Sequence, residues 1–488
     1  MKRPHTVVIG AGIGGLTAAC LLRHAGHRVT VLEAHVYPGG CAGTFYHKGY
    51  LFDAGATLAG GFSPGGPHAR LGELLGLDWP VTPIDPAWVV HLPDGRSVIQ
   101  YTEREQWQEE WHTHFPRTAS FWQTQQLLAE IAWDLSSRPF PWPPQSWSDW
   151  LSLACTLKPK TLLALPYLTR TIGNLAPQDD SIFTTFLDGQ LLIAAQTTSS
   201  HTNALYGSAA LDLPRRGVNH VQGGIGSLAK TLVKWLRDNG GQVLYRQKVE
   251  RIEVKKNRVT DIHTKKNQTF TGDNILANLT PWALSDLLGG ATPPDLKREV
   301  RQRETTWGAF TLYLGLDTAR LPPLTANHHQ VIVDANRPLA EGNSLFISLS
   351  DPSDPSRAPE GMRAATLSTH TAVSPWWRLR YSDKAAYEAR RAAYAECLLT
   401  AAERVIPGIR QAIHLCLPGT PVTFAYYTKR PSGMVGGFPQ ISLFKVRGPH
   451  TGLANLWLVG DSIFPGQSTA GVTFGGMRVA TAVLNSPT

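Results

Sequence analysis

His5-Thr-Val-Val-Ile9 leads directly into Gly10-Ala-Gly12-Ile-Gly14-Gly15, and this junction decides the fold. The first segment is a short run rich in β-branched residues, which predicts a buried parallel strand. A helix with apolar residues at helical spacing is predicted after the glycines, and it ends near Gly26. A second strand is predicted over residues 27–32. The sequence therefore begins with a strand–turn–helix–strand unit of the α/β class.

The glycine spacing matches the G-x-G-x-x-G turn that binds dinucleotides. Gly10 permits the tight turn, and Gly12 removes a Cβ that would keep the backbone away from a pyrophosphate. Gly15 lets the helix pack closely on the strand. The free N–H groups at the start of this helix, around Ile13 and Gly14, are placed to meet phosphate charge. The turn therefore predicts a dinucleotide site.

Glu33 and Ala34 follow the second strand. Glu33 lies eighteen positions after Gly15. A carboxylate at this place accepts hydrogen bonds from a ribose diol and disfavours a 2′-phosphate, so NADP is not expected here. A glycine-rich turn in an unrelated α/β fold is the alternative. Strand, helix, second strand and acid all fall in register, and this agreement favours the dinucleotide site.

Two further motifs follow, Gly39-Gly40-Cys-Ala-Gly-Thr44 and Phe52-Asp-Ala-Gly-Ala56-Thr57. They resemble the double-glycine turn and the F-D-x-G stretch of the flavin amine oxidase and phytoene desaturase superfamily. The resemblance implies FAD rather than NAD. It places the first motif along the cofactor and the second near the isoalloxazine ring.

The other end of the chain resembles the same superfamily. Leu456-Trp-Leu-Val-Gly460-Asp461 predicts a strand that ends in an acid, and Gly471-Val472 lies in the turn before an apolar helix. By resemblance, Asp461 meets the ribityl–phosphate region of FAD and the backbone near Val472 approaches the pyrimidine end of the ring. Val249 matches the valine whose backbone contacts the adenine side.

The resemblance implies a glutathione-reductase-like architecture, in which an α/β Rossmann-type FAD-binding domain is interleaved with an α+β substrate part. We expect the FAD-binding domain to comprise residues 1–95, 205–285 and 416–488. Residues 96–204 and 286–415 are expected to form a substrate-binding and membrane-docking domain.

Composition bears on the partners of the protein. Charged residues make up 17% of the chain, against about 25% in an ordinary globular domain, which suits a large apolar interior or an apolar ligand. The net charge is +9, but the basic residues are dispersed and no nucleic-acid-binding signature is present.

Seven tryptophans gather between positions 107 and 150, near Lys158 and Lys160. We expect peripheral association with the cytoplasmic side of a membrane; tryptophans that simply fill a core are the alternative.

The sequence assigns neither a metal site nor a catalytic side chain. Its five cysteines are scattered without a Cys-x-x-Cys pair, and no His-Glu-x-x-His spacing occurs. No Ser/His/Asp array or carboxylate pair stands out. Asp53, Tyr426 and Lys429 are expected in the cleft because of their neighbours, and they are interpreted as structural residues.

Within the superfamily the motifs are most similar to carotenoid desaturases and isomerases, above all to the 3′,4′-desaturase of the cyanobacterial type. The resemblance implies FAD-dependent desaturation of a C–C bond in a hydrophobic polyene. Reoxidation of the flavin then requires a quinone, oxygen or another electron acceptor, and the sequence does not distinguish among these. Carotenoid cis–trans isomerisation, carotene ketolation, amine oxidation and non-enzymatic binding of prenylated proteins remain as alternatives.

Overall fold

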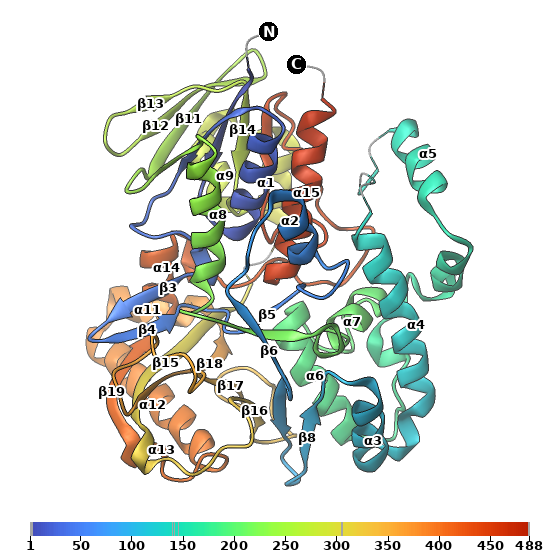
Figure 1. Ribbon diagram of the computed structural model, residues 1–488, viewed down its shortest axis with the longest axis vertical. Helices are drawn as coiled ribbons and strands as arrows, with labels where there is room; N and C mark the ends of the chain where they lie inside the picture. The colour runs from blue at the N-terminus through green and yellow to red at the C-terminus, as the bar shows by residue number, and fades with distance from the viewer. Residues whose placement is uncertain (1–2, 139, 141, 145, 304–305, 487–488) are drawn as a thin grey trace.

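Two large sheets dominate the molecule, and the chain crosses between them several times (Figure 1). The computed structural model describes residues 3–138, 140, 142–144, 146–303 and 306–486. The first sheet lies near the two termini and the second at the opposite end of the molecule. This interleaving confirms the expected mixed α/β architecture with a Rossmann-type domain and a substrate part.

The first sheet is parallel and five-stranded, with the order β10-β2-β1-β14-β20. Its strands are β10 (Gln242–Leu244), β2 (Arg28–Leu32), β1 (His5–Ile9), β14 (Asn274–Ala277) and β20 (Leu456–Leu458). β1 is central and almost wholly buried, as its continuous apolar run requires. Segments from both ends and the middle of the chain therefore complete one sheet.

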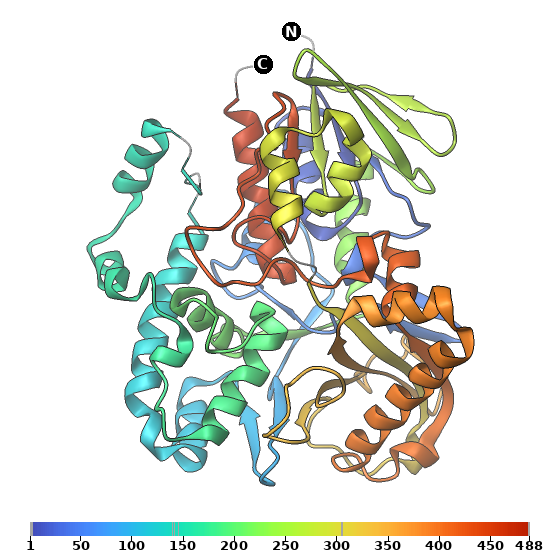
Figure 2. The ribbon, with the colours of Figure 1, turned by 180° about the vertical axis from the view of Figure 1, so that it is seen from behind.

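Helices cover both faces of this sheet. One face carries α1 (Ile13–His24), α8 (Gly226–Asp238) and α15 (Thr469–Leu484), with α2 (Pro67–Leu75) beside them. From behind, α9 (Pro281–Leu288) and α10 (Pro294–Gln302) lie in front of it (Figure 2). α1 and α15 pack side by side, which brings the two ends of the chain together.

The second sheet has seven strands in the order β19-β15-β18-β17-β16-β7-β8. Its strands are β19 (Ile413–Gly419), β15 (Gly308–Asp317), β18 (Met362–Thr371), β17 (Ser344–Leu349), β16 (His328–Ile332), β7 (Trp88–His91) and β8 (Ser97–Gln100). β7 pairs with β16 in parallel. The sheet thus extends across the domain limits expected at residues 95 and 416, because β7 and most of β19 join strands of the substrate part.

The two faces of the second sheet have different roles. Phe310, Leu312 and Leu314 of β15 are buried against α11 (Val373–Ser382), α12 (Lys384–Glu403) and α13 (Ile409–Ala412). The alternate residues Thr311 and Tyr313 face the other way, as the two-residue period of a strand requires. One face therefore packs a core and the other is free to line a cavity.

Small elements join the two halves. They are the hairpin β3 (Thr44–His47) and β4 (Tyr50–Asp53), the sheet of β5 (Ala59–Gly60), β9 (Val218–Val221) and β6 (Val81–Ile84), the sheet of β11 (Val249–Lys255), β12 (Arg258–Thr264) and β13 (Thr269–Phe270), and α14 (Pro421–Thr428).

The tryptophan-rich segment forms a helical region with two different environments. Its helices are α3 (Arg104–His114), α4 (Ala119–Ser136), α5 (Trp147–Thr156), α6 (Ser181–Ala195) and α7 (Ala204–Leu211). Trp107, Trp111 and Trp122 fill a buried aromatic core, whereas Trp147 is 86% exposed and Trp150 51% exposed on α5. Within the described residues, no helix combines the length and apolar character needed to cross a bilayer.

Candidate functional site

The two N-terminal glycine turns dock directly on each other. Gly39 donates its N–H to the carbonyl of Ala11 over 2.8 Å, and Gly12 and Gly39 form a parallel bridge. Gly39 has φ +118° and Gly40 has φ +59°, so both turns depend on conformations that glycine adopts most easily. The second turn thereby extends the cradle that the first one begins.

Asn278, just after β14, explains why the first turn tolerates no side chains. A Cβ on Gly12 would lie 2.4 Å from the Asn278 Nδ2 atom, and a Cβ on Gly15 would lie 2.8 Å from the Asn278 Cβ. A Cβ on Gly10 would lie 3.0 Å from the Asn278 carbonyl oxygen. Sequence reasoning did not select Asn278; its only signal was its place at the carboxyl end of a parallel strand, where such sheets bind ligands.

The C-terminal segment closes the same cradle. A Cβ on Gly14 would lie 3.1 Å from the Val472 carbonyl oxygen and 3.3 Å from the Gly460 Cα. A Cβ on Gly476 would lie 2.5 Å from the carbonyl oxygen of Gly14. Backbone thus meets backbone where α1 crosses α15, and only glycines allow this approach.

One cavity of about 1370 Å³ runs from these turns to the aromatic core of the helical region. An ordinary small-molecule pocket has roughly 300–1,000 Å³, so this space exceeds that of one small ligand. The predicted cofactor residues that line it are Gly10, Gly12, Ile13, Gly14, Glu33, Ala34, Gly39, Gly40, Ala56, Thr57, Val249, Gly460, Asp461 and Val472. Residues predicted from distant parts of the sequence therefore share one cavity.

Comparison with known proteins identifies the family. The family model described as flavin-containing amine oxidoreductase matches residues 13–484. The chain belongs to this family. It is 30% identical over 501 residues to the chloroplastic prolycopene isomerase of Daucus carota, covering 97% of this chain and 79% of that protein. It is 26% identical over 509 residues to the lycopene-forming phytoene desaturase of a Paracoccus species, covering 98% and 97%.

Among solved structures, the fold matches an oxidoreductase from Methanosarcina mazei with a TM-score of 0.67 at 19% identity, covering 98% of this chain and all of that one. These relationships make the protein a flavin oxidoreductase of the carotenoid desaturase and isomerase type, with FAD as its cofactor. The flavin-free binder of prenylated proteins is therefore the least supported alternative.

The cradle fits FAD at its phosphate end. The N–H groups of Ile13 and Gly14 belong to the first turn of α1, where the helix itself supplies no acceptor. Such N–H groups, together with the helix dipole, bind a pyrophosphate. Gly12 adds no side chain to this turn, and a Cβ there would crowd the Asn278 amide.

Glu33 fits a ribose diol. Its two carboxylate oxygens accept backbone N–H groups from Ala11 and His35, each over 2.7 Å. Burial nevertheless raises the pKa of the Glu33 carboxyl, because these two donors and the backbone N–H of Ala34 do not offset the loss of water around the charge. Each oxygen has a further lone pair, and hydroxyl donors would stabilise the carboxylate.

Asp461 is held by a cation that sequence reasoning missed. The Arg430 Nη1 atom lies 2.7 Å from Asp461 Oδ2, and the guanidinium also donates to the Gly436 carbonyl. Burial disfavours the charge of Arg430, but the Asp461 carboxylate more than compensates and raises the pKa of Arg430. This partly buried pair lines the cavity, and it positions Asp461 beside the FAD cradle. Only the spatial approach of two distant segments reveals it.

Three predicted residues do not line the cavity: Gly15, Thr44 and Gly471. Thr44 instead accepts the N–H of Gly226 over 2.8 Å and donates to Asp53 over 2.6 Å. Asp53 is 3% exposed and pairs with Arg357 over 2.9 Å. Thr44 and Asp53 therefore join the second glycine turn to the start of α8.

Of the other two residues expected in the cleft, Lys429 lines the cavity and Tyr426 does not. Lys429 lines the cavity, but its ammonium lies 4.5 Å from the centre of the Tyr426 ring and donates to the Tyr426 carbonyl. Tyr426 itself is 67% exposed. Lys429 is therefore tied to the exposed Tyr426 at one edge of the cavity.

Proposed function

We propose that this enzyme desaturates a C–C bond near the end of a long polyene, namely the 3′,4′ bond of a late carotenoid intermediate. The observation that carries the proposal is the continuity of the cavity, which joins the FAD cradle to an aromatic-lined pocket. When bound, FAD would accept both hydrogens that leave the C–C bond on desaturation, one as a hydride with its two electrons and the other as a proton. If the end group of a carotenoid occupied the aromatic pocket, the C–C bonds next to that end group would lie in the cavity that leads to the FAD cradle.

The middle of the cavity offers neutral walls. Tyr313 donates its hydroxyl to the Ala54 carbonyl over 2.7 Å, and burial raises its pKa. Burial also lowers the pKa of His370 to about 4, so the imidazole is neutral at pH 7. These side chains bind and orient an apolar chain and exclude water, and they leave no charge beside the reacting bond. The proposal needs no acid or base here, because charge developing on a polyene spreads over many carbons.

Cis–trans isomerisation of a carotenoid is the second candidate. The relatives with 29–30% identity bear the name prolycopene isomerase, whereas the phytoene desaturases reach 26%. Isomerisation conserves the mass of the pigment, desaturation removes two hydrogens, and ketolation adds oxygen.

Expression in a carotenoid-accumulating host separates these reactions. We expect the pigment to lose two hydrogens and to absorb at longer wavelength. A change of geometry with unchanged mass would replace desaturation by isomerisation. A Gly12→Ala variant, whose Cβ would lie 2.4 Å from the Asn278 Nδ2 atom at the cradle, serves as the inactive control, and a Gly290→Ala variant, whose Cβ meets nothing within 4 Å, serves as the active one.

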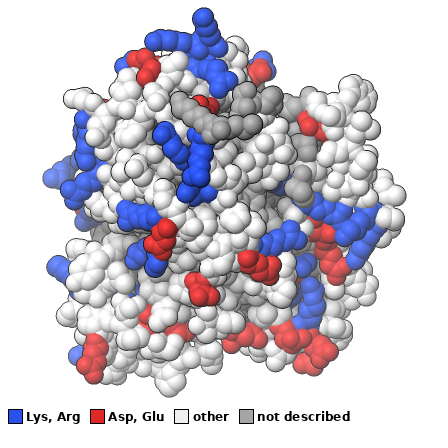
Figure 3. All heavy atoms as spheres, turned by 45° about the horizontal axis from the view of Figure 1, so that its top comes forward, with Lys and Arg blue, Asp and Glu red and all other residues white. Residues whose placement is uncertain are grey.

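We further propose that the segment from α5 to residue 170 docks on the cytoplasmic face of a membrane, so that polyene and quinone can reach the cavity from the bilayer. This segment stands away from the body of the molecule in Figure 1. Trp147 is 86% exposed, Leu151 66% and Leu163 54%, and the surface around α5 is largely uncharged in Figure 3. Exposed apolar side chains with tryptophan suit the interface of a bilayer.

Co-sedimentation with anionic phospholipid vesicles tests the docking segment. The triple variant Trp147→Ser, Leu151→Ser, Leu163→Ser should lose most vesicle binding, while Tyr381→Ser, which removes an 81% exposed aromatic elsewhere, should not. Equal binding of both variants would refute the docking surface without touching the proposed reaction. Oxygen as the final acceptor would show as turnover without vesicles.

A further inference from the structure

The far end of the cavity contains a cation. The cavity walls there include Trp107 of α3, Trp122 of α4 and Phe186 of α6, helices that lie at the opposite end of the molecule from the parallel sheet (Figure 1). Arg215, in the short 3₁₀ helix Pro214–Arg216, lines the cavity among these rings. Its guanidinium carbon lies 4.1 Å from the centre of the Trp107 ring. A charged group therefore borders an otherwise aromatic pocket.

Neutral acceptors hold Arg215 in place. Its Nη1 atom donates to the Tyr101 carbonyl over 2.8 Å, and Nη2 donates to the Gln100 Oε1 atom over 2.5 Å and to the Leu211 carbonyl over 3.4 Å. A guanidinium has five N–H groups. Among the described residues, two of them find no acceptor.

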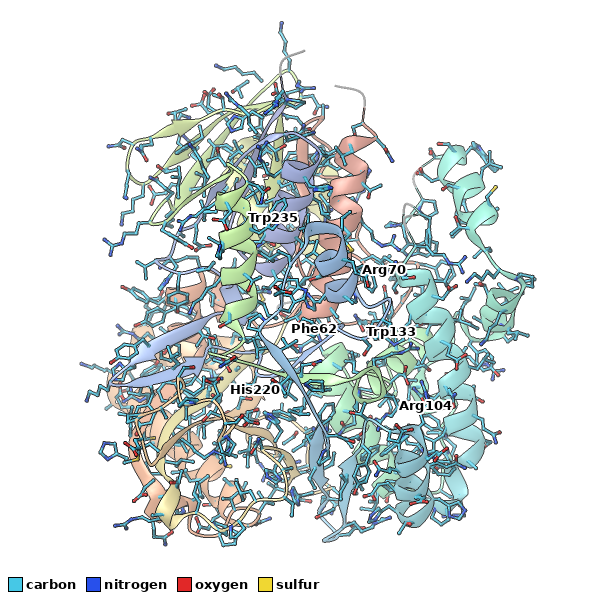
Figure 4. All side chains as sticks on the ribbon, in the orientation of Figure 1. Phe62, Arg70, Arg104, Trp133, His220 and Trp235 are labelled. Carbon is cyan, nitrogen blue, oxygen red and sulfur yellow. The ribbon has the colours of Figure 1, made fainter. Side chains whose placement is uncertain are left out.

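The carboxylate nearest in sequence is used by other cations. Asp212 pairs with Arg216 over 2.7 Å and with Arg104 over 3.4 Å, and Figure 4 shows Arg104 on α3 at the outer part of this region. No described carboxylate lies within ion-pair distance of Arg215. Burial lowers the pKa of Arg215 to about 9, so it remains charged at pH 7.

Gln100 adds a second donor to the same end of the cavity. The residue is 2% exposed and lines the cavity. Its Oε1 atom accepts from Arg215, whereas its Nε2 amide has no acceptor among the described residues. A buried cation and a buried amide thus present unused N–H groups to one space, which is the pattern of a site that fixes a polar ligand group.

We propose that Arg215, positioned by Gln100, is a specificity-determining residue that binds an oxygen atom on the end group of the polyene. This proposal rests on the proposed function, because it takes the occupant of the cavity to be a carotenoid. The hydrogen bonds would go from the N–H groups to a hydroxyl or carbonyl oxygen. A pure hydrocarbon would leave these donors unpaired in a dry pocket, and sites built in this way reject such analogues strongly.

Binding measured without turnover tests the proposal. The probes are lycopene and its terminally hydroxylated derivative, and the readout is quenching of tryptophan fluorescence in the FAD-loaded protein. A hydrogen bond to a charged donor corresponds to a roughly 10- to 150-fold ratio of affinities, so we expect the hydroxylated pigment to bind that much more tightly. Arg215→Leu should abolish the ratio by weakening the hydroxylated pigment and not the hydrocarbon.

Further variants separate recognition from folding. Arg215→Lys keeps a charged donor and should retain part of the ratio, while Gln100→Leu should lower it. Arg104→Leu, which removes the neighbouring cation outside the cavity, should leave it unchanged. FAD content and the melting temperature establish that each variant is folded. An equal affinity of the wild type for both pigments, or a ratio that survives in Arg215→Leu, would overturn the proposal.

The two proposals can fail separately. A preference for the oxygenated pigment that depends on Arg215, found together with a pigment of unchanged mass, would reject desaturation and support the role proposed for Arg215. Loss of two hydrogens from both pigments at equal rates, with no preference in binding, would support desaturation and reject the role proposed for Arg215.

Discussion

Replacing Glu33 by glutamine should weaken FAD binding while leaving the fold almost as stable. Each oxygen of the Glu33 carboxylate accepts one backbone N–H over 2.7 Å. Glutamine keeps one oxygen, but its NH₂ group would oppose the N–H of Ala11 or His35. The protein alone loses one charge-assisted hydrogen bond of about 1.5–3 kcal/mol, and it recovers much of this because a buried charge is removed. We expect the free energy of unfolding without FAD to change by about 1 kcal/mol or less.

FAD loses more in this variant. One ribose hydroxyl would face a donor instead of an acceptor, and the missing charged hydrogen bond of about 1.5–3 kcal/mol corresponds to a roughly 10- to 150-fold higher Kd. Titration of the FAD-free protein, followed by flavin fluorescence, measures this change. Glu360→Gln, at an exposed carboxylate, is the control. A Kd of the Glu33 variant within twofold of the wild type would refute the assignment of this carboxylate to the ribose.

The same carboxyl predicts the pH dependence of FAD binding. Burial raises the pKa of Glu33 above its ordinary value of 4.5, so the FAD-free folded protein holds this proton more tightly than the unfolded chain does. The FAD-free protein therefore gains stability from this group as the pH falls through the raised pKa. The ribose hydroxyls of FAD favour the charged form of Glu33. FAD affinity should therefore fall as the pH falls through the same range. In Glu33→Gln this part of the pH dependence should disappear.

Two further predictions concern the frame of the cradle. Gly476→Ala should lower stability by about 1–3 kcal/mol, because its Cβ would lie 2.5 Å from the Gly14 carbonyl; thermal melting beside Gly290→Ala measures this, and equal melting temperatures would contradict it. Asp53→Asn should cost about 3–5 kcal/mol in urea unfolding, because it breaks the buried pair with Arg357. A loss below about 1 kcal/mol would show that this joint is not structural.

The parts of the fold that could be predicted are mainly those that local sequence determines. The strand, turn, helix and second strand were expected from spacing alone, and the structure places them at His5–Ile9, Ile13–His24 and Arg28–Leu32. These elements could be predicted because glycine freedom and apolar periodicity act within a few residues. The resemblance of the C-terminal motif then supplied the partner, α15, that completes the cradle.

What the sequence could not reveal depends on contacts between distant segments. The Arg430 pair with Asp461 and the position of Asn278 against three glycines follow from how the strands are ordered, and no local pattern encodes that order. Likewise, β7 joins β16 in parallel across a separation of more than two hundred residues. The hydrogen bond that Thr44 accepts from Gly226 could not be predicted for the same reason, because Gly226 lies far along the chain.

The tryptophans show how one composition signal can contain two physical environments. Trp107, Trp111 and Trp122 recur on the inner faces of α3 and α4 and are buried, while Trp147 and Trp150 on α5 remain exposed. Buried rings such as Trp107 and Trp122 line the pocket that continues the FAD cradle, and the exposed rings of α5 belong to the proposed docking segment. A polyene that leaves a bilayer needs both, because it must be released from lipid at one place and held away from water at another. The division of the tryptophans between core and surface is therefore a better argument for the proposed docking segment than their number is.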